Sequence, residues 1–262
     1  AGEGNDSLNG GSGNDALDAG IGDDSLYGQA GNDSLLGGTG KDYLNGGTDN
    51  DYLFGGDGND QISGSDGSDS VLGGNGNDTL KGENGNDTLY GDYGDDSMLG
   101  GYGSDLLIGG YGNDNLNGND DNDILADSYG MDYFTGGNGD DILVSIRDNA
   151  NDTMSGGAGA DMFIFAPIGT DGIGSDRIMD FSLTQSDRIL IAGGTGADKV
   201  NHSISYLDTD RNGKYDATLI SLSSGSTSLG SITVYKNLLT ADKVEYYELS
   251  PGDIQLPENI VI

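Results

Sequence analysis

Large apolar side chains recur along this chain at every ninth position from Leu8 to Leu143, separated by polar segments rich in glycine. An aspartate stands two residues before each of these apolar positions. The clearest unit is Gly73-Gly74-Asn75-Gly76-Asn77-Asp78-Thr79-Leu80-Lys81. Alternate side chains of a β-strand point to opposite sides, so the last three residues of the unit predict a short strand with its apolar side chain inward. The six residues before them predict a loop.

A three-residue strand buries too little apolar surface to be stable alone, so the units are expected to stack on one another. Glycine in the loops accepts positive φ angles and lets neighbouring backbones approach closely, which turns loop carbonyl groups toward a shared space. The pattern therefore predicts a one-dimensional solenoid in which each turn rests only on its neighbours.

The aspartates of the repeat supply negative charge to that shared space. Sixteen are in register from Asp6 to Asp141, Asp152 follows after a two-residue insertion, and Asp161 lies nine residues further on. Calcium takes about six to eight oxygen ligands from carboxylates, backbone carbonyls and water, whereas magnesium needs a tighter octahedron. Zinc and copper prefer nitrogen or sulfur ligands, but the chain has no cysteine and one histidine, His202. The repeats therefore predict bound calcium.

The unit matches the pattern GGxGxDxUx, where U is a large apolar residue, which is found in calcium-binding β-helix repeats. The chain resembles the repeats-in-toxin (RTX) family of secreted calcium-binding proteins. In that family two nonapeptides form one right-handed turn, so the resemblance implies an all-β fold, a right-handed parallel β-roll of about nine turns. Aspartates 18 residues apart then share a column. One column contains Asp6, Asp24, Asp42, Asp60, Asp78, Asp96, Asp114 and Asp132, and the other contains Asp15, Asp33, Asp51, Asp69, Asp87, Asp105, Asp123 and Asp141.

Each column would stack carboxylates at a strand spacing of about 4.8 Å. Such repulsion is expected to keep the chain unfolded without cations, so that metal binding is coupled to folding. With Asp152 and Asp161 added, nine loops per column leave eight gaps, which hold at most about sixteen calcium ions. Their charge would offset most of the formal net charge of −35.

Some repeats depart from the pattern. Asp49 and Asp121 replace the fourth-position glycine, Asp127 replaces the first, and an insertion lies within 145–151. Calcium is least expected beside these loops, which we interpret as ordinary turns between well-formed sites.

Composition changes near residue 166, where glycine thins out and β-branched residues increase. We expect a β-roll over 1–165 and a β-rich C-terminal cap over 166–262. Short strands are predicted at 162–166, 177–181, 188–192, 203–207, 217–222, 231–236 and 243–247. The segment Asp176-Arg177-Ile178-Met179-Asp180-Phe181, followed by Asp187-Arg188-Ile189, resembles the DxIxDF...DxI segment that follows the repeats in RTX proteases, and capping is its expected role.

A second calcium motif is suggested within the cap. Asp208, Asp210, Asn212 and Asp216 match the first nine positions of a calcium loop, with glycine at the sharp turn. Leu219 stands where an EF-hand has its bidentate glutamate, so a hairpin around Asn212-Gly213 is an equal alternative.

Charge and motifs narrow the classes of function. Forty-five acidic residues against ten Lys and Arg argue against a nucleic acid or an anionic membrane surface as partner. No apolar run reaches the ~18 residues of a transmembrane helix. The chain has no HExxH, GxSxG or nucleophilic cysteine, so we expect no enzyme activity in it. A catalytic domain upstream of Ala1 is an alternative, because the first repeat begins in mid-motif.

The resemblance implies a secreted protein, extracellular or at the cell surface, exported by type I secretion machinery. Glu258-Asn259-Ile260-Val261-Ile262 is compatible with the C-terminal secretion signal of that family and equally with a simple terminal strand. The expected function is a calcium-dependent folding, secretion and stabilising module. The alternative is an adhesion, surface-layer or polysaccharide-binding module.

Two surface features motivate that alternative. The outward positions of one sheet form an apolar stripe, which we expect the cap, a missing domain or a second chain to cover, a dimer being one outcome. Its members are Leu36, Phe54, Leu72, Tyr90, Ile108, Ala126 and Val144. Tyr93, Tyr111 and Tyr129 form a ladder at 18-residue spacing, which either binds sugar rings or packs ring on ring.

Overall fold

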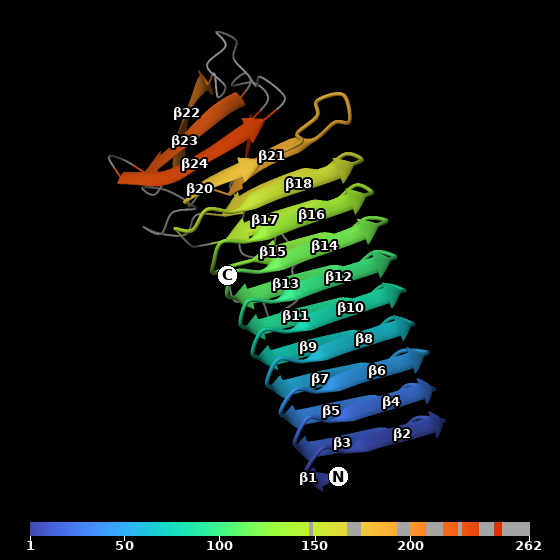
Figure 1. Cartoon of the computed structure of the whole chain (residues 1–262). Helices are drawn as coiled ribbons and strands as arrows, with labels where there is room; N and C mark the ends of the chain where they lie inside the picture. Colours follow the sequence, from blue (N-terminus) through green and yellow to red (C-terminus); the bar gives the residue numbers. More distant parts are fainter. Residues whose placement is uncertain are drawn as a thin grey trace.

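The computed structural model describes residues 1–146, 149–166, 174–192, 200–207, 217–224, 227–235 and 244–247. In these residues the chain winds back and forth between two sheets, forming a parallel β-solenoid of about nine turns (Figure 1). None of the described residues belongs to a helix of the length and hydropathy needed to cross a bilayer. The expected all-β roll is confirmed.

The first sheet contains β1 (Gly2–Glu3), β3 (Ala16–Ile21), β5 (Ser34–Thr39), β7 (Tyr52–Asp57), β9 (Ser70–Asn75), β11 (Thr88–Tyr93), β13 (Leu106–Tyr111), β15 (Ile124–Asp127), β17 (Ile142–Ile146), β19 (Met162–Ala166), β21 (Arg188–Ala192) and β25 (Val244–Tyr247), in that order. The second sheet contains β2 (Ser7–Ser12), β4 (Ser25–Ala30), β6 (Tyr43–Thr48), β8 (Gln61–Asp66), β10 (Thr79–Asn84), β12 (Ser97–Tyr102), β14 (Asn115–Asp120), β16 (Tyr133–Asn138), β18 (Thr153–Ala158), β20 (Ser175–Ile178), β24 (Thr227–Tyr235), β23 (Ala217–Ser224) and β22 (Val200–Leu207). Strands β22, β23 and β24 pair antiparallel, whereas the other neighbours are parallel.

The repeat strands are longer than the sequence pattern predicts. Strand β10 runs from Thr79 to Asn84 and includes the glycine-rich part of its unit, and most other repeat strands also have six residues. The prediction of three-residue strands and six-residue loops was therefore wrong. Stacking is the reason: Glu83 pairs with Ser65 on one side and Gly101 on the other, so the backbone ladder continues through positions assigned to a loop.

The core is a single column of apolar side chains between the two sheets. Leu44, Leu80, Leu89 and their counterparts in the other turns are fully buried and pack in one continuous cluster. Each such side chain contributes about 1.5 to 3 kcal/mol of transfer free energy. Leu8 and Leu17 are only partly buried because they lie at the end of the stack. The expectation that these side chains point inward is confirmed.

The apolar stripe on the outside of the first sheet changes along the solenoid. Leu36 is 37% exposed, and Phe54, Leu72, Tyr90 and Ile108 are half-buried. Ala126 and Val144, further along, are buried and pack in a second cluster with Ile146, Ile164, Ala166 and Leu190. What covers the earlier part of the stripe, and whether a dimer forms through it, stay predictions.

The sheets continue past residue 166, since β20 pairs with β18 and β21 with β19. Strands β19 and β21 have the bounds expected from the sequence, while β20 ends at Ile178 instead of residue 181. His202 lies in β22. The calcium motif of Asp208, Asp210, Asn212 and Asp216, and the segment 258–262, lie outside the described residues.

Candidate metal sites

The structure places the repeat aspartates in two columns, as expected. In each column the backbone N–H of one aspartate donates to Oδ1 of the aspartate in the next turn, at 2.6–3.2 Å. The N–H of Asp78, for example, donates to Asp96 over 2.7 Å. Asp6 and Asp15 are partly exposed at the end of the stack, whereas the repeat aspartates from Asp24 onward are at most 4% exposed.

Each column is one aspartate longer than the repeats suggest. The N–H of Asp152 donates to Oδ1 of Asp176 at 3.0 Å, and the N–H of Asp161 donates to Oδ1 of Asp187 at 3.2 Å. Both residues were expected to belong to the cap and were not predicted as ligands. The signal was present, because each begins an Asp-Arg-Ile triplet that matches the DxU part of the repeat.

In most of the column aspartates the second carboxylate oxygen, Oδ2, is buried without a hydrogen-bond partner. This holds for Oδ2 of Asp15, Asp24, Asp33, Asp42, Asp51, Asp60, Asp69, Asp78, Asp87, Asp96, Asp105, Asp114, Asp123, Asp141 and Asp161. A buried, ionised and unpaired oxygen is costly. Repeated in every turn, such oxygens call for a cation along each column.

Burial raises the pKa of several carboxyl groups in the middle of the columns. Burial, opposed by the hydrogen bond from a backbone N–H and reinforced by neighbouring aspartates, raises the pKa of Asp78 and Asp96 to about 7. The same causes raise the pKa of Asp123 to about 8 and that of Asp87 to about 6. Without a metal ion, burial in the folded chain therefore favours the protonated form of these four carboxyl groups.

The first-position glycines leave room at the corner where these oxygens point. A Cβ on Gly46 would collide with Oδ2 of Asp51 and would lie 2.8 Å from the carbonyl oxygen of Gly64 in the next turn. The carboxylate and a backbone carbonyl thus approach one open point, and the same arrangement recurs at Gly55 and Gly82. Hard oxygen donors of this kind are the ligand set that calcium prefers, so the residues fit this ion.

A second ladder, not predicted from the sequence, organises the loops. Side chains at the fifth repeat position accept from the backbone N–H of the following turn, as Asn50 does from Ser68 at 2.8 Å and Asn32 from Asn50 at 3.2 Å. This direction is opposite to that of the aspartate columns. The signal was the frequent Asn or Asp at that position. Each loop is thereby tied to the turns before and after it.

The irregular loops are accommodated in different ways. Asp49 and Asp121 adopt the positive φ angles, 74° and 75°, that the replaced glycine would take, which aspartate tolerates better than most residues. Ser145 occupies a first-glycine position, and its hydroxyl donates to Oδ2 of Asp152 at 2.8 Å. These loops keep the backbone path of the roll.

The tyrosine ladder packs ring on ring. The rings of Tyr93 and Tyr111 lie 4.9 Å apart and those of Tyr111 and Tyr129 4.5 Å apart, with interplanar angles of 3° and 7°. The ring faces between them are covered by one another, although all three side chains remain exposed. This geometry favours a packing role over the stacking of sugar rings.

The fold and its two aspartate columns define a calcium-binding parallel β-roll. A family model described as RTX calcium-binding nonapeptide repeat (4 copies) matches residues 1–35, 36–71, 63–98, 72–107, 99–126, 118–145 and 148–164. These segments span more than half of the chain, which therefore belongs to the RTX calcium-binding repeat family. Calcium is the ion that these repeats imply.

Several solved structures are similar in part. The AlgE6R3 subunit of the Azotobacter vinelandii mannuronan C5-epimerase is 24% identical, with a TM-score of 0.37, covering 61% of this chain and 88% of that one. A hyperactive Ca2+-dependent β-helical antifreeze protein from an Antarctic bacterium is 30% identical, with a TM-score of 0.30, covering 70% and 67%. Extracellular lipase LipA from Serratia marcescens is 17% identical, with a TM-score of 0.23, covering 71% and 41%. No curated protein matches the chain.

Proposed function

We propose that this chain is a calcium-driven folding module of a secreted bacterial protein. The observation that carries the proposal is the series of buried, unpartnered Oδ2 atoms in both columns. Aspartates of successive turns, such as Asp78 and Asp96, would hold one ion together with nearby loop carbonyls. When bound, calcium supplies the positive charge that offsets the stacked carboxylates, and no reaction is required of it.

In this proposal the availability of calcium decides whether the chain is folded or unfolded. Extracellular calcium modules bind with dissociation constants of about 0.1 to 1 mM, far weaker than the sites of cytosolic buffers. A chain whose carboxylates repel one another within each column would stay unfolded at low calcium, a state suited to export by type I secretion machinery. It would then fold outside the cell and stabilise the protein to which it belongs. In this proposal the module is not catalytic.

The test is order with and without calcium. Circular dichroism and small-angle X-ray scattering of the whole chain should show an expanded chain in excess chelator and a compact β-rich chain in millimolar calcium. Magnesium at the same concentration is the control and should restore far less structure, because it keeps its waters and requires a tighter octahedron. A chain that keeps its β-signal and compact radius in chelator would contradict the proposal.

A further inference from the structure

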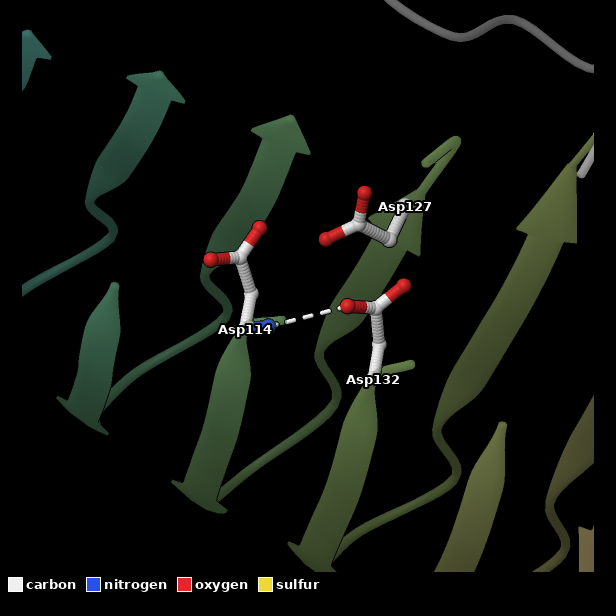
Figure 2. Close-up of side chains that lie close together, drawn as sticks. All are labelled: Asp114, Asp127 and Asp132. Atoms are coloured by element: carbon white, nitrogen blue, oxygen red, sulfur yellow. Dashed lines mark hydrogen bonds between the residues drawn. The ribbon is translucent and has the colours of Figure 1, made fainter. Parts of the chain in front are cut away.

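Three carboxylates meet at one corner of the roll, because one loop carries a second buried aspartate beside its column aspartate. Asp127, at the end of β15, stands where the repeat has its first glycine, and its side chain lies beside those of Asp114 and Asp132 (Figure 2). One carboxylate oxygen from each residue lies within 4.8 Å of the other two. The three residues are at most 2% exposed. The cluster is therefore shielded from water.

The hydrogen bonds of Asp127 fix its side chain and leave one oxygen directed into the cluster. Oδ1 accepts from the N–H of Ser128 at 2.5 Å and of Gly110 at 3.1 Å. Oδ2 is buried and has no hydrogen-bond partner, and the same is true of Oδ2 of Asp114. Both oxygens lie close to the point where a side chain on Gly109 would begin. Two acceptors therefore face each other across a small space that glycine keeps open.

The next turn has a hydrogen-bond donor at this position. Ser145 occupies the equivalent place one turn later, is 1% exposed, and its hydroxyl donates to Oδ2 of Asp152. A hydroxyl is a donor, so it satisfies the neighbouring carboxylate directly. An ionised Asp127 has no proton to donate, so its meeting with Asp114 requires either a proton shared between the two carboxyl groups or a cation.

We propose that Asp114, Asp127 and Asp132 together hold the tightest calcium ion of the roll, with Asp127 as an added ligand that ordinary repeats lack. The inference rests on the proposed function, since it assumes that the columns bind calcium. Affinity of oxygen sites rises with the number of carboxylate ligands and with their rigidity. This corner has one more carboxylate than its neighbours, and backbone N–H groups hold that carboxylate in place. It is the first site to fill as calcium rises.

The test is isothermal calcium titration of the whole chain and of three single variants. Asp127→Asn keeps the size of the side chain and removes its charge, and Asp127→Ser reproduces the arrangement at Ser145. Asp121→Asn is the matched control, because it removes the same charge from an exposed position outside the cluster. The unaltered chain should bind one ion more tightly than the rest. Both Asp127 variants should weaken that first ion by about tenfold or more, while Asp121→Asn leaves it unchanged.

Circular dichroism at saturating calcium establishes that each variant folds, and Asp127→Ser is the safer of the two because the chain already uses serine at this place. Equal first-ion affinity in the unaltered chain and in both Asp127 variants would overturn the inference, and would mean that a shared proton or nothing occupies the corner. Absence of calcium binding in every protein, the control included, would instead overturn the proposed function.

Discussion

At the scale of the residue, each column aspartate combines two roles through its two oxygens. Oδ1 of Asp78 accepts from the N–H of Asp60 at 2.8 Å and so fixes the loop of the preceding turn. Oδ2 is buried without a partner and is available to a cation. Asparagine would retain one acceptor but lose the charge, so the structural and ion-binding roles can be separated by substitution.

The position of an aspartate in its column should decide how much it matters. Asp78→Ala removes a buried carboxylate between well-formed turns, whereas Asp6→Ala acts at the partly exposed end of the stack. Because each turn rests only on its neighbours, loss of a central ligand interrupts the column, while loss of an end ligand shortens it. Calcium titrations followed by circular dichroism should show the larger midpoint shift for Asp78→Ala, about tenfold. Equal shifts would mean that the sites do not couple along the stack.

At the scale of the element, the segment after the repeats extends the aspartate columns and the core together. Asp176 and Asp187 extend the columns, and Ile178 and Phe181 are fully buried. The ring of Phe181 lies 6.1 Å from that of Phe163. Asp180 accepts from the N–H groups of Gly156 and Gly157 and from the hydroxyl of Ser155. The segment thus extends the apolar core and satisfies three donors of β18.

Asp180 should therefore stabilise the end of the roll. Asp180→Ala leaves three donors without their acceptor, and an unsatisfied buried group costs about 1 to 3 kcal/mol, with a value near the lower end expected here because the site is only part-buried. Thermal unfolding at saturating calcium measures the loss. Met179→Ala, at the exposed neighbouring residue, is the control and should have little effect. If the two variants are equally stable, Asp180 has no capping role.

Part of the fold and of the metal sites could be predicted from the sequence. The nine-residue period predicts the inward apolar side chains, because these depend on alternation and register alone. The two sheets and the two aspartate columns follow from the resemblance to the RTX family, which implies two repeats per turn. The period missed the extension of the strands through Glu83 and its counterparts, because ladder pairing depends on stacking and not on β-propensity. It missed Asp176 and Asp187 because they lie 24 and 26 residues from their column neighbours, outside the period of 18.

At the scale of the whole molecule, the solenoid is an acidic rod whose charge is partly internal. The net charge is −35, and the buried share of it lies in the two columns. Protons and calcium ions compete for those same oxygens. Acid should therefore help the metal-free chain to fold, but it should weaken calcium binding.

The pKa values determine whether the stability of the metal-free fold rises or falls with pH. In the metal-free fold the pKa of Asp78 and Asp96 is raised from 3.8 to about 7, mainly by burial. Between these values the folded state binds more protons than the unfolded state, so stability falls as pH rises through this window. The stabilising contribution is fully present below the unfolded pKa and is lost above the folded one. The metal-free chain is thus least stable at neutral and alkaline pH.

In excess chelator, the circular dichroism of the chain should gain β-signal as pH is lowered from about 8 to about 5, because column aspartates take up protons on folding. The lower limit stays above the isoelectric point, about 4.1, to avoid precipitation. With calcium present, the midpoint of the calcium titration should move to higher concentration over the same range, because protons displace the ion. A parallel series in high salt controls for general screening, which weakens repulsion between exposed charges far more than between buried ones. A β-signal independent of pH in chelator would show that protonation of the columns does not stabilise the metal-free fold.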